Sequence, residues 1–429
     1  MSNKLTRRVV ITGAGFSAPA QLPIQNRIIT KMTEKPEYDF LSGRLPLESR
    51  KFLDAYITVG LFLLNNYGKN DYHMLDSEYR DLCLSRYIRE YLEIVKPAIM
   101  NDARDSEKII NNFKNIIPSP DDEYTSIYSL RNKIRIAIKQ ENISVNLEDV
   151  FTSFDKSFSS SEYVHKYSYA KMDEIRYSIM RLFSFYFSKS VMEHTYDMQD
   201  YVSFLTYIKK RRSKRPITII TTNWDTLLEQ YFQKNDMDYC YGFLFPYTTE
   251  DFTDSLSDNS LLLLKIHGSA NWLKCLQCGA ISVYRDNNAA SSLFEDLRHE
   301  RCYLCGAEED LYGPSLQPEI ITPTMMKSLS NRLYSNIWGG ASSELREATH
   351  IIFAGYSLSI ADFDFRYMLQ KSVPESAIID VVLYKDADPN QTQNESLKEL
   401  LPEKRYRDAF PKNIINFYYD GFGNYFRDQ

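Results

Sequence analysis

Four cysteines stand in two closely spaced pairs, the pattern in this chain with the most specific chemistry. Cys275 and Cys278 form one C-x-x-C pair, and Cys302 and Cys305 form a second after 23 intervening residues. Two such pairs supply four thiolates, the ligand set of a tetrahedral structural zinc site. The linker is slightly longer than usual, but residues 279–301 are polar with little core of their own, which suits a small ribbon held by metal. The alternative interpretation is four free thiols.

A glycine-rich turn follows the first apolar stretch. In VVITGAGFSA, residues 9–18, Gly13, Ala14, Gly15 and Ser17 come directly after a run typical of a buried strand. Glycines in a G-x-G-x-x-A turn permit close approach of a pyrophosphate, and the following helix N-terminus supplies N–H donors. The motif alone also fits a simple strand-to-helix turn. A long helical region follows instead of a short helix and an acidic strand end, which argues against hydride transfer.

Polar residues follow a second apolar run. Thr222, Asn223 and Asp225 lie at and just after the end of ITIITT, residues 217–222. In open α/β sheets, ligands bind at the carboxyl ends of the strands, so these side chains are candidates for ligand contact. Asp225 fits the role of a helix cap equally well.

Two further runs end in residues that suit the same crevice. His267 ends LLLLKIH and precedes Gly268, and a neutral imidazole there could take a proton from a ribose hydroxyl. A lone histidine is more often structural. Gly355 and Ser357 follow HIIFA, where a small residue and a hydroxyl would line the crevice or form a turn before a helix capped by Ser359.

The elements that must position these residues alternate along the chain. Near-continuous Val/Ile/Leu runs predict parallel strands covered on both faces, and segments between several of them have helical spacing. The predicted strands are residues 9–12, 217–222, 261–267, 319–323, 350–355, 378–384 and 413–419.

Residues 31–212 have a different pattern, with apolar residues at three- and four-residue spacing and a break near Pro118 and Pro120. We therefore predict an α/β fold: a Rossmann-like parallel sheet with helices on both faces, a small zinc-ribbon module and a large all-helical insertion. The sheet domain comprises residues 1–30 and 213–429, with the zinc module at 275–305 inside it.

Composition limits the function classes. The chain has 429 residues, 43% of them hydrophobic, and a formal net charge of −6, which argues against direct nucleic-acid binding or attraction to anionic membranes. No apolar run approaches the roughly 20 residues that span a bilayer, and the start lacks the apolar segment of a signal peptide. We expect a cytoplasmic protein. Its 32 tyrosines and 24 phenylalanines fit either helix packing or an oligomer interface.

The order of these motifs resembles that of the sirtuin family. GAGFSA, Pro23, TTNWD, HGS, the two C-x-x-C pairs and GYSL occur in the family's order, over residues 7–28 and about 214–390. The resemblance implies a Rossmann-like sheet that binds NAD beside a zinc module, and cleavage of the bond between nicotinamide and ribose.

Residue roles follow from the resemblance by position. Asn223 resembles the asparagine that holds the ribose hydroxyls and orients the attacking group, His267 the general base, and Asp225 the contact to the nicotinamide carboxamide. The remaining implied NAD-binding residues are Gly13, Ala14, Gly15, Ser17, Thr222, Gly355 and Ser357.

The departures from the family bear on the reaction. The Asp and Phe that deacylases carry in their Gly-Ile-Pro-Asp-Phe-Arg segment are missing from QLPIQNR, residues 21–27, and the Phe-Gly-Glu segment that clamps an acyl-lysine peptide is replaced by EIITPTMMKSL. The pattern looks more like bacterial sirtuin-like effectors that deplete NAD during phage infection. It implies an NAD⁺ glycohydrolase that forms nicotinamide and ADP-ribose, a homo-oligomer, and a partner ATPase of the HerA type. An NAD-dependent protein deacylase and a non-catalytic NAD or ADP-ribose sensor are the alternatives.

Overall fold

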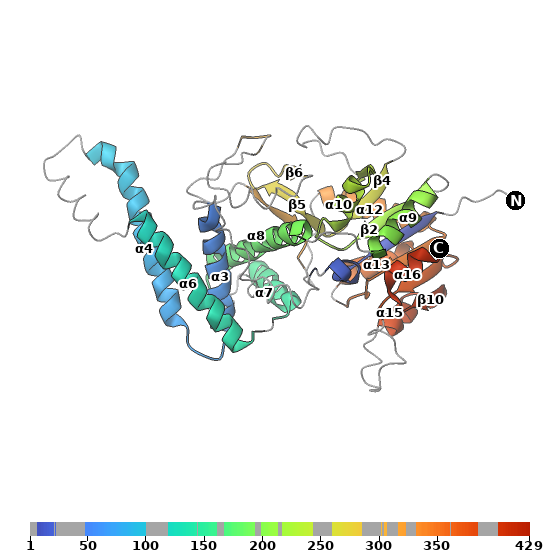
Figure 1. The fold of residues 1–429 in the computed structure, drawn as a ribbon, viewed down its shortest axis with the longest axis horizontal. Coiled ribbons are helices and arrows are strands. Elements are labelled where there is room, and N and C mark those ends of the chain that lie inside the picture. The colour runs from blue at the N-terminus through green and yellow to red at the C-terminus, as the bar shows by residue number, and fades with distance from the viewer. Residues whose placement is uncertain are drawn as a thin grey trace.

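Most elements of the predicted α/β architecture lie in the part of the chain that the structure describes. The computed structural model describes residues 7–20, 22, 48–99, 119–143, 145–160, 167–193, 199–212, 217–242, 260–284, 302, 304–306, 316–322, 332–360, 362–384 and 402–429. Pro23, Pro118 and most of the QLPIQNR and EIITPTMMKSL segments lie outside these residues. Figure 1 shows the sheet at one end of the molecule and a group of long helices at the other.

Seven parallel strands form the main sheet, which confirms the predicted Rossmann-like fold. Across the sheet they are β10 (Ile414–Tyr418), β9 (Ile378–Val382), β8 (His350–Ala354), β1 (Arg8–Thr12), β2 (Ile217–Thr221), β4 (Leu261–Lys265) and β3 (Tyr239–Cys240). The central strand β1 pairs with β2 and β8 so that Thr12 lies opposite both Thr221 and Ala354. The carboxyl ends of these strands therefore meet at one edge.

The prediction for residues 319–323 is wrong. This apolar run belongs to β7 (Leu316–Ile320), which pairs antiparallel with β5 (Gly268–Cys275) in a separate sheet of order β6-β5-β7, where β6 is Ile281–Val283. The seventh parallel strand is instead β3, which has only two residues. An apolar run shows that a strand is buried but not which sheet it joins, and β7 is buried because a helix covers the small sheet.

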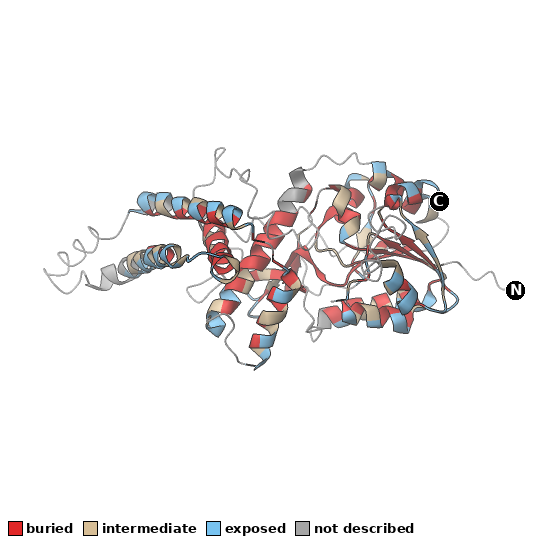
Figure 2. Cartoon of the chain, turned by 90° about the horizontal axis from the view of Figure 1, so that it is seen from below, coloured by how far each residue is buried: buried red, intermediate tan, exposed pale blue. Residues whose placement is uncertain are grey.

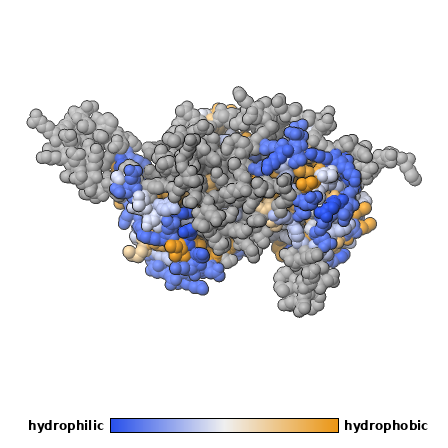
Figure 3. All heavy atoms as spheres, viewed as in Figure 1, coloured by the Kyte–Doolittle hydropathy of each residue, from blue (hydrophilic) through white to orange (hydrophobic). Residues whose placement is uncertain are grey.

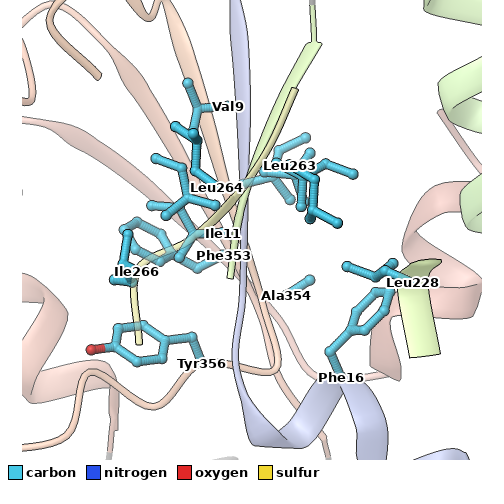
Figure 4. Close-up of a cluster of buried hydrophobic side chains, with 14 of the residues drawn as sticks. Val9, Ile11, Phe16, Leu228, Leu263, Leu264, Ile266, Phe353, Ala354 and Tyr356 are labelled. Atoms are coloured by element: carbon cyan, nitrogen blue, oxygen red, sulfur yellow. The ribbon is translucent and has the colours of Figure 1, made fainter. Parts of the chain in front are cut away.

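Helices cover both faces of the parallel sheet. One face carries α9 (Gln199–Arg212), α10 (Leu227–Lys234) and α16 (Gly421–Arg427), and the other carries α12 (Arg332–Glu347), α13 (Phe363–Ser372) and α15 (Pro402–Ala409). Figure 4 shows Phe16 and Leu228 on one side of β1 and Ile266 and Tyr356 on the other. On the first face the Phe16 ring lies 4.3 Å from that of Phe422 and 5.1 Å from that of Phe204.

Helix α9 packs with the sheet. Its buried side chains, among them Tyr201 and Phe204, belong to the same hydrophobic cluster as β1 and β2, and the Tyr201 hydroxyl donates to the Phe16 carbonyl oxygen at 2.6 Å. The proposed domain boundary at residue 212 assigns α9 to the insertion. The boundaries stay a prediction, and this packing favours placing the second one before Gln199.

Five long helices form the described part of the insertion. They are α3 (Glu48–Tyr67), α4 (His73–Ile99), α6 (Pro120–Glu141), α7 (Leu147–Ser160) and α8 (Tyr169–Glu193). Helix α6 begins where the break was predicted: Ser119 accepts from the Asp122 N–H and Pro120 follows it, and the helix ends at Asn142 with φ 50°. Figure 2 shows more buried residues along α3 and α8 than along the outer pair α4 and α6.

The insertion and the small sheet share a second hydrophobic cluster. Helix α8 crosses from the long helices toward the parallel sheet (Figure 1) and packs on β5 and β7. The Ser184 hydroxyl donates to the Ala270 carbonyl oxygen at 2.5 Å, and the Tyr177 hydroxyl donates to that of Leu316 at 2.6 Å. The buried side chains of Leu273, which lies in β5, and of Cys275 belong to this cluster and not to that of the parallel sheet. The small sheet therefore contributes to both cores, because Trp272, Ile281 and Val283 belong to the cluster of the parallel sheet.

Among the described residues, no helix combines the length and apolar character that a membrane crossing requires. On the face seen in Figure 3, hydrophobic residues of the described part occur in small groups among hydrophilic ones.

One buried carboxylate should make stability depend on acid pH. Asp380 accepts from Asn416 at 2.8 Å and from the Tyr425 hydroxyl at 2.5 Å, and the His350 Nε2 lies 2.7 Å from it. Burial opposes its ionisation, but these hydrogen bonds outweigh burial and lower the pKa of Asp380. Since the unfolded value is about 3.9, its stabilisation is complete above about pH 4 and is lost as the pH falls through the folded value.

We expect Asp380→Asn to lower the free energy of unfolding at pH 7 by about 1–3 kcal/mol, with less loss below pH 4. Urea unfolding at several pH values measures this. An equal loss at pH 7 and pH 3 would contradict the proposed charge dependence.

Candidate functional site

Two turns at the carboxyl edge of the sheet approach each other closely. The Gly15 N–H donates to the Gly355 carbonyl oxygen at 2.9 Å, and the Gly13 N–H donates to that of Ala354 at 3.3 Å. Gly355 has φ +67°, and a Cβ atom there would lie 2.1 Å from the Phe16 nitrogen. These glycines are required for backbone contact between the turns. Because two of their N–H groups already bind protein carbonyls, a phosphate would have to use other donors of the turn or displace these bonds.

Three predicted residues form a connected hydrogen-bonded group at this edge. The Asn223 amide nitrogen donates to the Gly13 carbonyl oxygen and to Ser17 Oγ, both at 2.9 Å. Ser17 Oγ donates to Asp225 Oδ2 at 2.8 Å, and Asp225 Oδ1 accepts from the Leu227 N–H. The loop after β2 is therefore bound to the turn after β1. Asn223 makes both bonds with its nitrogen, so the amide oxygen is the atom that it can offer to a ligand.

His267 lies at the matching position of the neighbouring strand. Thr221 pairs with Lys265 in the register of β2 and β4, and Asn223 and His267 each come two residues later. Adjacent strands lie about 4.8 Å apart, so both side chains leave the same edge of the sheet. The register therefore places the two residues at neighbouring strand ends.

A carboxylate that the sequence did not reveal lies beside His267. The His267 Nε2 atom lies 3.1 Å from Asp362 Oδ1, and both side chains are buried. The Tyr356 hydroxyl donates to Asp362 Oδ2 at 2.8 Å. Burial, and then the Asp362 charge, raise the pKa of Tyr356 well above its usual value, so this hydroxyl stays protonated and remains a donor.

The cap of the following helix explains why Asp362 was missed. Ser359 was predicted to cap this helix, but α13 begins at Phe363 with Asp362 at the N-cap position. The Asp362 side chain makes no capping hydrogen bond. An acidic residue at a helix start is ordinarily assigned to capping, so nothing in the sequence indicated its contact with His267.

The other predicted residues are placed less centrally. Thr222 binds the end of β1, since its N–H donates to the Thr12 carbonyl oxygen at 3.1 Å. Ala14 and Ser357 are exposed beside the two turns. Trp224, between Asn223 and Asp225, packs against the insertion: its ring stacks on Phe183 of α8 at 6.0 Å.

The four paired cysteines converge at the end of β5. Their sulfur atoms all lie within 4.8 Å of one another, with Cys275 and Cys305 at 3.7 Å and Cys278 and Cys302 at 3.5 Å. A tetrahedral zinc with Zn–S bonds of about 2.3 Å requires separations of about 3.8 Å. The donor set therefore fits zinc, and four thiolates leave no position for a catalytic water.

Matching turns position the two pairs. The Gly279 N–H donates to the Cys275 carbonyl oxygen and the Gly306 N–H to that of Cys302, at 2.9 and 2.7 Å. Each pair thus forms the same tight turn, closed by a glycine with positive φ.

Comparison with known proteins supports the resemblance in its general form. Residues 217–400 match the SIR2-like domain. The matched range contains Asn223, Asp225, His267 and the four cysteines, while the glycine turn at Gly13 precedes it. No curated protein matches the chain.

Solved structures similar to the chain include several Sir2 proteins. One, described for the mechanism and regulation of Sir2 enzymes, is 15% identical with a TM-score of 0.30, and the match covers 53% of this chain and 65% of that one, slightly less than two thirds. A complex of a Sir2 homologue with NAD is 15% identical over 58% and 70%, with a TM-score of 0.32. A structure concerning sirtuin substrate affinity is 11% identical over 99% and 93%, with a TM-score of 0.36. These values are too low to transfer residue roles.

The Asp362 contact yields a specific prediction. If the carboxylate orients a catalytic imidazole, Asp362→Asn should slow the reaction proposed below by about tenfold or more. Asp364→Asn, in the same helix, is the matched control. Rates of nicotinamide release measure the effect, and equal rates for Asp362→Asn and wild type would contradict it.

Proposed function

We propose that the protein is an NAD⁺ glycohydrolase, which cleaves NAD to nicotinamide and ADP-ribose. The observation that supports this proposal is that Asn223 and His267 follow adjacent parallel strands at matching positions, and that each is held by a buried polar partner. The match of residues 217–400 to the SIR2-like domain supports NAD as the substrate.

Cleavage of the bond between nicotinamide and ribose depends on fixed polar groups more than on a general acid. Nicotinamide leaves NAD⁺ as a neutral base, because the electron pair of the breaking C–N bond quenches the charge on its ring. The transition state resembles an oxocarbenium ion, so positioned dipoles and a positioned water carry much of the rate. We assign the Asn223 amide oxygen to orienting water or a ribose hydroxyl near the anomeric carbon. His267 accepts the proton of that hydroxyl or water.

The remaining side chains bind and support the substrate in this proposal. Ser17 and Asp225 hold the Asn223 amide, and Asp225 lies beside the expected nicotinamide carboxamide. Gly13, Ala14, Gly15, Thr222, Gly355 and Ser357 surround the phosphates and adenosine. Cys275, Cys278, Cys302 and Cys305 would hold a structural zinc, which supports the fold of the ribbon and takes no part in the reaction.

The biological role that we propose is depletion of NAD in antiphage defence. It rests on the resemblance of the motifs and the long insertion to bacterial effectors of this kind. The same resemblance supports a cytoplasmic homo-oligomer that works with an ATPase of the HerA type.

Product analysis with and without an acetylated peptide tests the proposal. Purified protein is incubated with NAD over a range of protein concentrations, and nicotinamide and ADP-ribose are measured by chromatography. Release of both products without peptide is the expected result. Release that requires the peptide would indicate a deacylase, and NAD binding without release at any concentration would indicate a sensor.

A further inference from the structure

A buried ion pair lies directly behind the loop that carries Asn223 and Asp225. Lys265, the last residue of β4, and Glu229 of α10 have side chains that are 1% and 2% exposed, and Lys265 Nζ lies 2.7 Å from Glu229 Oε1. The same Nζ donates to the Asp225 carbonyl oxygen at 2.5 Å. The charged group therefore touches both its partner carboxylate and the backbone of the candidate site.

A buried ion pair needs a reason beyond stability. Removing two charges from water is costly, and replacing such a pair by apolar side chains often leaves stability unchanged or raises it. An apolar pair, however, offers no donor to the Asp225 carbonyl oxygen. A cationic donor in a low-dielectric interior makes one of the stronger hydrogen bonds available to a backbone oxygen.

The preceding carbonyl of the loop, that of Trp224, is bound by the backbone of β5. The Ala270 N–H donates to the Trp224 carbonyl oxygen at 2.8 Å. Two consecutive backbone oxygens, those of Trp224 and Asp225, are thus bound from behind, while the side chains of Asn223 and Asp225 bind Ser17 on the other side.

Glu229 is also held by Tyr241, the residue that follows β3. The Tyr241 hydroxyl donates to Glu229 Oε1 at 3.1 Å, and Asn271 of β5 approaches that hydroxyl at 3.5 Å. Asn271 also donates to the Tyr284 carbonyl oxygen at 2.8 Å. The ion pair is therefore part of a polar network that extends from the site loop to the zinc ribbon.

We propose that Lys265 is a positioning residue: its ammonium fixes residues 223–225 through the Asp225 carbonyl, and Glu229 neutralises and aims that ammonium. The expected effect of Lys265 on the reaction rests on the proposed function. Its expected effect on the order of the loop does not depend on that function. If the loop is already fixed before NAD binds, the Asn223 oxygen is in place, and no conformational entropy has to be lost to order the loop in the transition state.

The double variant Lys265→Met/Glu229→Gln tests the proposal. Either single substitution leaves an uncompensated buried charge, whereas the double variant removes both charges and keeps similar side-chain volumes. We expect its melting temperature and zinc content to stay near wild-type values. Amides of residues 222–226 should exchange with deuterium at least about tenfold faster, and kcat for nicotinamide release should fall at least about tenfold.

Lys412→Met/Glu375→Gln is the matched control, because it removes an ion pair of similar length, 2.6 Å, whose side chains are both 69% exposed and which takes no part in this network. It should exchange and react much like wild type. Unchanged loop exchange in a folded double variant would overturn the proposal, as would faster exchange with full activity.

A measurement on wild type keeps the proposal testable should the double variant fail to fold. Without NAD, amides of residues 222–226 should exchange as slowly as those of β2, and exchange within seconds would overturn the proposal. If wild type releases no nicotinamide, the proposed function fails, while the exchange data still decide whether Lys265 fixes the loop.

Discussion

His267→Ala and Asn223→Ala should each reduce nicotinamide release from NAD by on the order of 10²–10³-fold, equivalent to about 3–4 kcal/mol of transition-state stabilisation. Asn223 provides an oriented oxygen because both bonds of its amide nitrogen are taken by Gly13 and Ser17. In the proposed reaction His267 is the base, and the structure holds it next to Asp362. We expect neither side chain to replace the other, since Asn223 and His267 follow different strands.

The two variants need a fold control and a side-chain control. Zinc content and melting temperature should remain near wild type, because neither residue binds the metal. His73→Ala removes a histidine whose side chain is 81% exposed at the start of α4 and should leave the rate unchanged. Full turnover by either site variant would refute its assigned role.

Loss of the metal site should unfold more than the ribbon. In Cys275→Ser/Cys302→Ser, we expect no bound zinc and a marked loss of helical circular dichroism on mild heating. Zinc binding to four thiolates supplies about 10 kcal/mol or more of free energy that is coupled to folding. Cys275 and Cys302 are buried in the hydrophobic cluster that also contains the interior of α3, α6 and α8. Disorder of the ribbon therefore exposes apolar surface of the insertion.

Cys83→Ser is the matched control for this prediction, since Cys83 lies on α4 outside the four-cysteine group. Its zinc content and helix content should stay at wild-type levels. Zinc is measured by mass spectrometry of the metal, and helix content by circular dichroism against temperature. A zinc-free double variant that melts as wild type would show that the metal does not support the insertion.

Most strands of the parallel sheet were predictable because they are buried on both faces, whereas β10 at the sheet edge alternates between exposed and half-buried residues. Uninterrupted apolar runs mark β1, β2, β4, β8, β9 and β10 within one or two residues of their bounds. The same signal misplaced β7, since an apolar run carries no information about its pairing partner. The two-residue strand β3 and the polar strand β5 gave no comparable run. Their positions depend on contacts with β4, α8 and the cysteines, which are distant in sequence.

Parts of the site were predictable for a similar reason. Parallel strands in register bring their ends together, so polar residues just after β2 and β4 had to share one edge. Which atoms meet there depends on the turns, and no spacing rule gives the bond from Asn223 to Ser17. Asp362 and Lys265 were missed because one looked like a cap and the other like the polar end of a strand.

The Trp224 ring joins the helical insertion to the loop of the candidate site. It stacks on Phe183 with an angle of 19° between the rings, and Phe187 meets it edge-on. Both phenylalanines belong to α8, a helix of 25 residues that also packs against α3 and α7 of the insertion. The insertion therefore packs directly against the loop that carries Asn223 and Asp225 and forms one side of its surroundings.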